Sequence, residues 1–316
     1  MPTERQAGPV EIGEALTLRD ETGLTVIEVG LRATLYFKNG HSLERRRAVA
    51  ACFEEFFGMA GDRLRWVIPT GLRQQDSSLD QAAAALIADL SAEAFDEDDT
   101  WEFIWHAGEA IDAASSLMIQ GFGCQAWKSA PPRNALSFLS VVFPLTFFAD
   151  RPFGLPTLLA RWADRLGAFH GYGGIGLSYS PDRFVAFRYG SQILGFGMRF
   201  PGLELDYPIQ HSLWCKEGIK GGNWLTVLAT EFVDRLGGIA QLSTTLGEPF
   251  VFTDYSGGIL IQAGPVPEVG DRNRQIDTPT YARLARALKP VRIRINGTVT
   301  GISREKFAAW LDRFDE

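Results

Sequence analysis

The chain has 316 residues, of which 46% are hydrophobic and 22% are charged, a composition that is ordinary for a folded protein and argues against extensive disorder. Its formal net charge is −7 at pH 7, which argues against direct, non-specific binding to nucleic acid because that needs a basic surface. The longest apolar stretch, residues 138–149, is interrupted by Pro144 and is too short to cross a bilayer.

The first half of the chain predicts alternating strands and helices. Residues 24–37 are rich in β-branched and apolar side chains and lead into an Asn-Gly turn signal, which predicts a strand. Ser42 is placed to cap a helix whose apolar residues recur every three or four positions as far as Gly58. The remaining predicted elements of this half are strands over 64–68, 101–105 and 116–119, and a helix over 77–90.

The second half repeats the order strand, helix, strand after a proline-containing linker predicted over residues 126–134. The elements that carry the repeat are a strand over 138–148, an amphipathic helix over 155–169 and an extended segment over 176–179. The later predictions are a helix over 183–198, a helix from Thr278 to Leu288, a half-exposed strand over 291–295 that leads into an Asn-Gly turn, and a last helix over 303–314.

This recurrence predicts an α+β fold of two similar strand–helix–strand lobes, with mostly antiparallel sheets and amphipathic helices packed on them. The predicted division is an N-terminal segment over 1–23, for which flexibility is expected, an N-terminal lobe over 24–130 and a C-terminal lobe over 131–316. One continuous domain is the alternative. Since residues 1–13 contain no apolar run, no secretory signal is predicted and a cytoplasmic location is expected.

The chain has three cysteines and four histidines, and their spacing fits neither a disulfide framework nor a zinc site. Cys215 and His211 could be imagined as a nucleophile and its base, but no orienting acid or oxyanion loop lies nearby in the sequence. No serine-hydrolase elbow occurs. These patterns predict a protein without a catalytic residue, a bound metal or a cofactor.

The segment 218–226 reads GIKGGNWLT and invites comparison with a phosphate-binding loop. In such a loop the lysine follows the glycines, whereas Lys220 precedes the glycine pair and Asn223 follows it. The segment is therefore interpreted as a tight turn in which glycines adopt positive φ and Trp224 enters the core. A Gly221→Val substitution is expected to damage folding first.

The alternative for this segment is an anion pocket for a phosphorylated small molecule. It would require Lys220 and Asn223 to converge with Asp271 or Arg272. A second glycine-rich run, residues 169–176, follows a predicted helix instead of preceding one, so it is interpreted as a helix end that passes into a tight turn and a strand.

The densest cluster of charge in the sequence precedes the predicted strand 101–105. It is interpreted as a solvated acidic loop. The functional alternative is a negatively charged protrusion that attracts a basic partner surface or imitates the phosphates of nucleic acid. The residues assigned to partner binding are Asp96, Glu97, Asp98, Asp99, Trp101 and Glu102. The tryptophans considered as interface anchors are Trp101, Trp105, Trp127 and Trp214, with core packing as the alternative for each.

Several segments taken together resemble a bacterial family, the type VI secretion immunity proteins. The resemblance rests on the order along the chain of residues 30–37, 39–41, 169–176, 205–208, 218–226, 261–264, 270–273 and 288–292. The signature positions, interpreted as structural, are Gly218, Lys220, Gly221, Gly222, Asn223, Trp224, Gly264, Asp271 and Asn273.

The resemblance implies an antitoxin that binds a cognate type VI effector, with a VRR-NUC nuclease as the specific version, and occludes its active site. The expected partner is that effector, with no direct contact to nucleic acid or membrane; a homo-oligomer is left open. The family pattern names no catalytic residue, so no enzymatic activity is expected. The alternatives are an enzyme or binding protein for a phosphorylated small molecule that uses residues 218–226, and a structural or adaptor protein of a secretion or phage system.

Overall fold

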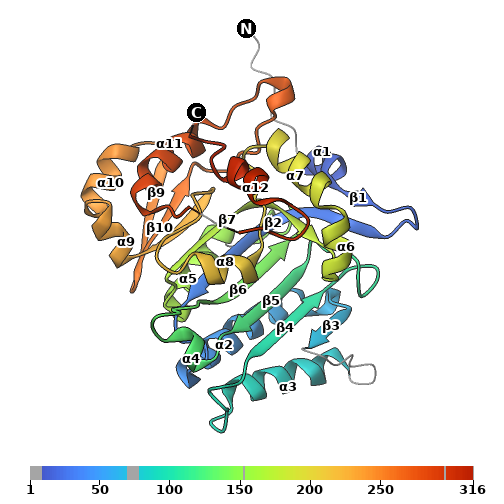
Figure 1. Ribbon diagram of the computed structural model, residues 1–316. Coiled ribbons are helices and arrows are strands. Elements are labelled where there is room, and N and C mark those ends of the chain that lie inside the picture. The colour runs from blue at the N-terminus through green and yellow to red at the C-terminus, as the bar shows by residue number, and fades with distance from the viewer. Residues whose placement is uncertain (1–8, 70–77, 152–153, 295–296, 316) are drawn as a thin grey trace.

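The computed structural model describes residues 9–69, 78–151, 154–294 and 297–315. Within these residues the chain forms one ten-stranded sheet with helices on both faces (Figure 1). All pairings between the named strands are antiparallel, so the predicted α+β class is confirmed. None of the helices in the described ranges has both the length and the apolar character that spanning a membrane requires.

The strands follow the order β3-β4-β5-β6-β2-β7-β8-β10-β9 across the sheet, and β1 pairs with β2. Their bounds are β1 Leu18–Arg19, β2 Thr25–Phe37, β3 Trp66–Pro69, β4 Trp101–His106, β5 Met118–Gly123, β6 Ser137–Phe143, β7 His170–Tyr179, β8 Leu225–Ala229, β9 Phe250–Tyr255 and β10 Gly258–Ala263. The central strand β2 pairs with β6 on one side and with β7 on the other.

The helices are mostly short. Their bounds are α1 Pro9–Leu16, α2 Leu43–Ala60, α3 Leu79–Ser91, α4 Ala126–Ser129, α5 Leu155–Leu166, α6 Arg183–Arg188, α7 Gly190–Arg199, α8 Pro208–Trp214, α9 Thr230–Arg235, α10 Gly238–Leu246, α11 Pro279–Leu288 and α12 Arg304–Leu311. Ser42 caps α2 as predicted, because its side chain accepts a hydrogen bond from the Arg45 amide.

The two faces of the sheet are covered by different helices. On the back face, Phe53 of α2 packs against Phe103 and Trp105 of β4, with ring centroids 5.6 and 5.1 Å apart. The opposite, front face carries Arg32 and Thr34 of β2, and α8 and α12 lie over it (Figure 1). The front face is where the polar groups of the interior gather.

The predicted boundary between residues 130 and 131 falls between β5 and β6, which are hydrogen-bonded neighbours in the one sheet. Both predicted lobes therefore contribute strands to it, and the division into two lobes stays a prediction. In the predicted N-terminal segment, the described part forms α1 and β1. The predicted linker contains the short helix α4.

Three local predictions were wrong. Residues 291–294, the described part of the predicted strand, form no named strand, because Lys289–Val291 is a 3₁₀ helix and the Arg292 guanidinium lies 2.9 Å from Asp312. Ile295 and Asn296, the latter being part of the predicted turn, lie outside the described residues. The helix predicted over 183–198 is divided into α6 and α7 at Tyr189. The glycine-rich run 169–176 is a central strand and not a turn.

Candidate functional site

A cluster of four charged side chains is buried on the front face, between the central strands and the segments that cross them. Its members, called the buried charge cluster below, are Arg32 on β2, Glu204 and Asp206 before α8, and Lys220, each at most 5% exposed. Lys220 lies in residues 218–226, called the signature loop below. Charges are expensive to bury unless they are paired and hydrogen-bonded. Two cations and two carboxylates make the cluster neutral overall.

Asp206 is the centre of the hydrogen bonding. Its Oδ2 atom accepts from Arg32 Nε at 3.0 Å and from the Thr34 hydroxyl at 2.6 Å. Its Oδ1 atom accepts from the Tyr172 hydroxyl and lies 3.3 Å from His211 Nδ1. The carboxylate therefore joins β2, β7 and α8.

Lys220 joins the signature loop to the same centre. Its ammonium donates to Glu204 Oε1, lies 3.9 Å from Asp206 Oδ1, and sits 3.7 Å from the centroid of the Tyr172 ring. Asn223 Nδ2 donates to the other Glu204 oxygen at 2.7 Å. Both oxygens of the buried Glu204 carboxylate are thus satisfied by the signature loop.

The protonation states follow from this arrangement. Burial alone would raise the pKa of the Asp206 carboxyl, but the Arg32 charge, the His211 hydrogen bond and the Lys220 charge together hold it well below its usual range. Burial, supported by the Lys220 charge, lowers the pKa of His211 to about 4. Asp206 is therefore ionised and His211 neutral at pH 7.

The glycine-rich strand β7 makes room for the cluster. Gly174 lies under Asn223, so that a Cβ atom on Gly174 would stand 2.2 Å from Asn223 Oδ1. Gly176 lies under Glu204, where a Cβ atom would stand 3.1 Å from the Glu204 Cβ. The two glycine-rich runs of the sequence therefore belong to one assembly, with the charged loop packed on the glycine strand.

None of the glycines of the signature loop adopts positive φ, contrary to the prediction, and two of the three are closely packed. A Cβ atom on Gly222 would meet the Leu284 side chain at 2.7 Å, and one on Gly218 would meet the Val291 carbonyl oxygen at 2.5 Å. A Cβ atom on Gly221 would have open space around it, which gives no packing reason for Gly221→Val to damage folding. Trp224 is buried as predicted.

The other signature positions also have structural contacts. Gly264 accepts a hydrogen bond from Trp224 Nε1 at 3.0 Å and has a φ of 86°, in the region that favours glycine. Asp271 accepts from Arg199 at 3.0 and 2.9 Å and caps a short 3₁₀ turn through the amide of Asn273. These positions lie in several segments, and their assignment as structural stays a prediction.

The convergence that a phosphate pocket would require does not occur. Lys220 is 5% exposed and faces Glu204 and Asp206, whereas Asp271 pairs with Arg199. Two carboxylates around the ammonium would repel a phosphate. The alternative of an anion pocket formed by the signature loop is therefore not supported by the geometry.

The Cys215 and His211 pair has no nucleophilic character. Burial raises the pKa of the Cys215 thiol to about 12, so the thiol is protonated at neutral pH. Within the described ranges, no group of three or more histidine, cysteine and carboxylate side chains is placed to hold a metal ion.

The residues assigned to partner binding lie at the beginning of β4. Asp96, Glu97, Asp98 and Asp99, called the acidic loop below, are exposed, and none of the four forms an ion pair in the described part of the chain. Glu102 is exposed on β4. Trp101 is 8% exposed and donates to the Gly40 carbonyl at 2.8 Å, so it anchors the base of the loop instead of presenting its ring to solvent.

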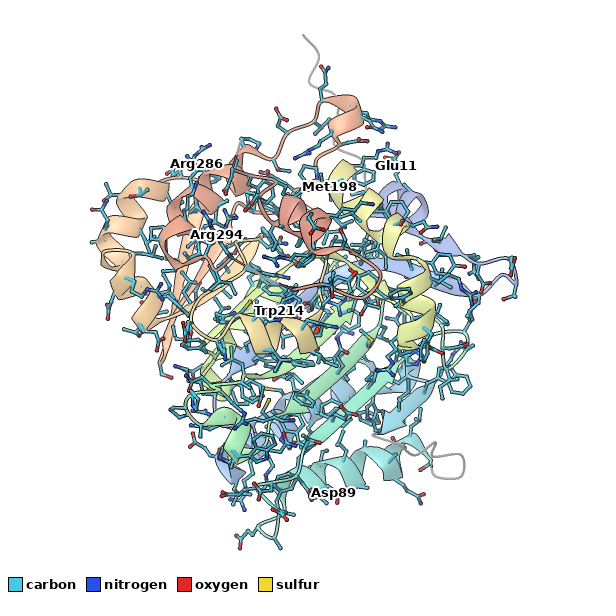
Figure 2. The ribbon with its side chains drawn as sticks, viewed as in Figure 1. Glu11, Asp89, Met198, Trp214, Arg286 and Arg294 are labelled. Atoms are coloured by element: carbon cyan, nitrogen blue, oxygen red, sulfur yellow. The ribbon has the colours of Figure 1, made fainter. Side chains whose placement is uncertain are left out.

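The other tryptophans considered as anchors differ in exposure. Trp105 is buried in the core, Trp214 is half-buried on α8, and Trp127 on α4 is 45% exposed. Figure 2 shows Trp214 near the middle of the front face. Only Trp127 and Trp214 present ring surface toward solvent among these four.

Residues 48–314 match a protein-family model described as TsiV, type VI immunity for VRR-NUC. Among solved structures, the fold is similar to that of a type VI secretion system (T6SS) protein of Pseudomonas aeruginosa, PA0821, with a TM-score of 0.81 and 26% sequence identity. The similarity covers 95% of this chain and 87% of that chain. Comparison with curated proteins returned no match.

Proposed function

Because this chain belongs to the TsiV family of type VI immunity proteins for VRR-NUC, we propose that it neutralises a VRR-NUC nuclease effector by binding over the active site of that effector. The observation that carries the proposal is the family match over residues 48–314, which includes the signature loop and the strand on which it packs.

The chemistry of the interior supports binding over catalysis. The polar groups of the buried charge cluster are engaged with one another, and Cys215 is protonated. His211 of α8 and Trp310 of α12 lie against the cluster. We infer that the cluster serves as a support for the surface above it and that the chain acts without catalysing a reaction. A nuclease would endanger DNA in the cytoplasm, so we propose that the complex forms there.

The acidic loop is the first candidate for contact with the effector. A nuclease must bind the phosphates of its substrate, so its substrate groove is basic, and four exposed carboxylates complement such a groove. Charge complementarity of this kind speeds association more than it raises affinity. We propose that the acidic loop guides the effector onto the front face without direct contact to nucleic acid.

Charge reversal tests this role. The variant in which Asp96, Glu97, Asp98 and Asp99 are all changed to lysine is expected to associate with the effector at least about 10-fold more slowly at low salt. The matched control reverses four exposed carboxylates elsewhere, Asp234, Glu248, Asp254 and Asp277, and gives the same net charge. Surface plasmon resonance measures the association rate constant of each folded variant with the effector. Equal rates for the two variants would remove the acidic loop from the mechanism.

A further inference from the structure

Four large apolar side chains are exposed on two short helices, α6 and α8. Phe184 and Phe187 on α6 are 71% and 65% exposed, and Ile209 and Leu213 on α8 are 52% and 48% exposed. Each pair has helical spacing of three or four residues, so each pair points to one side of its helix. The four residues are called the apolar patch below.

Residues 297–303, the segment of chain that precedes α12, cross between the two helices and contact both (Figure 1). Gly297 packs against the Trp214 ring of α8, and Gly301 packs against the backbone of Phe187 on α6. A hollow of about 510 Å³ is lined by Phe187, Gln210 and this segment. The two halves of the apolar patch therefore lie on either side of this segment, and Phe187 lines the hollow beside it.

The buried charge cluster holds one half of the patch in place. His211 of α8 lies 3.3 Å from the buried Asp206 carboxylate, and its ring stacks on Phe307 of α12. The side chains of Ile209 and Leu213 lie on the opposite side of the same helix and are exposed. Since His211 is fixed in the interior, the exposed side of α8 is presented in one orientation.

The size of the patch indicates a part of a protein interface. A phenylalanine offers about 150–250 Å² of surface, so the exposed fractions of the four side chains together present roughly 450 Å². The largest apolar patch that a monomeric protein leaves uncovered is typically about 300–600 Å², and such patches are often functional. A stable interface needs about 800 Å² on each partner, so the patch has the dimensions of an anchor within a larger contact.

The charges beside the patch identify the kind of surface that fits it. Arg183 and Arg188 of α6 are exposed, and neither forms an ion pair in the ranges that the structure describes. Arginine and large aromatic side chains are the residues that dominate binding energy in interfaces. A two-fold dimer centred on the patch would bring the arginines of both copies together, which opposes self-association.

We propose that the apolar patch is the anchor that holds the effector, and that the effector surface facing it is apolar and bordered by carboxylates. This inference rests on the proposed function, since the occupant is the effector. It is independent of the acidic loop, which affects the rate of encounter, because the patch determines how slowly the complex dissociates.

The test uses single charges placed in the patch. Phe187→Asp and Leu213→Asp are expected to weaken effector binding about 30-fold or more, mainly through faster dissociation. Val266→Asp is the matched control, because Val266 is 59% exposed outside the patch, and its affinity is expected to stay within about 3-fold of the wild type. Phe184→Ser, at the most exposed position, provides a second variant that adds no charge.

The outcomes separate the two proposals. If the wild-type chain binds the effector and the patch variants bind equally well, the patch is not the anchor, although the proposed function stands. If the folded wild-type chain does not bind the effector at all, the proposed function itself fails. A wild-type dimer in sedimentation equilibrium that dissociates in Phe187→Asp would assign the patch to self-association and overturn the inference.

Discussion

Removing the charge of Lys220 tests the role of the buried charge cluster. A Lys220→Met substitution keeps most of the length and the apolar part of the side chain, but it leaves Glu204 and Asp206 with Arg32 as the one remaining cation of the cluster. One buried negative charge is then uncompensated. The Glu204 oxygen that accepted from the ammonium also loses a hydrogen bond.

The size of the effect follows from the geometry. Two unit charges about 4 Å apart attract each other by about 4 kcal/mol at an effective dielectric constant of 20, and Lys220 lies 3.9 Å from Asp206 and closer to Glu204. The methionine variant no longer has to desolvate an ammonium, which offsets part of the loss. We therefore expect the free energy of unfolding to fall by about 3–5 kcal/mol, as for other buried pairs that lose one partner.

Urea denaturation measures this loss, provided that the m-value, the slope of the free energy of unfolding against urea concentration, is the same for the variants. Lys38→Met is the matched control, because Lys38 is exposed and pairs with Glu231 at 3.3 Å, and it is expected to cost less than about 1 kcal/mol. Adding Glu204→Gln to Lys220→Met restores neutrality and is expected to recover part of the stability. A loss for Lys220→Met as small as that of the control would refute the reasoning.

Two further predictions concern stability. Burial lowers the pKa of His106 and His211 to about 4 and that of His170 to about 3, so between pH 6.5 and 5 the unfolded chain binds more protons than the folded chain. The free energy of unfolding should therefore fall on acidification by up to about 1.4 kcal/mol per pH unit for each histidine. Equal free energies of unfolding at pH 7 and pH 5 would contradict this prediction. Gly222→Ala should lower stability by about 1–3 kcal/mol because its Cβ meets Leu284, whereas Gly221→Ala should change stability by less than about 0.5 kcal/mol. Thermal unfolding distinguishes the two variants, and equal melting temperatures would contradict the prediction.

Local patterns were sufficient for the elements with strong periodicity or a clear cap. The strand at β2, the Ser42 cap of α2 and the amphipathic helix α5 were predicted close to their observed bounds. The strand β7 was not predicted over its observed length, because its four glycines, taken alone, indicate turns. Two of these glycines, Gly174 and Gly176, are explained by residues more than 25 positions further along the chain, because Asn223 and Glu204 pack on them.

The centre of the site could not be assembled from the sequence. Lys220 and Asn223 were singled out, but their partners Glu204, Asp206 and Arg32 were not, since pairing across the sheet is a tertiary property. One signal was present: Arg32 lies among buried residues of the central strand, and a charge in such a position requires a buried partner. The apolar patch also gave no signal, because Phe184 and Phe187 fit a core pattern equally well.

The central claim is that this chain neutralises a VRR-NUC effector by binding it. The most direct measurement is DNA cleavage by the purified cognate VRR-NUC effector, titrated with the wild-type chain. The prediction is that cleavage falls in proportion to the added chain and ends near an equimolar ratio, and that Phe187→Asp requires a large excess for the same effect. Full cleavage in the presence of excess folded wild-type chain would contradict the claim.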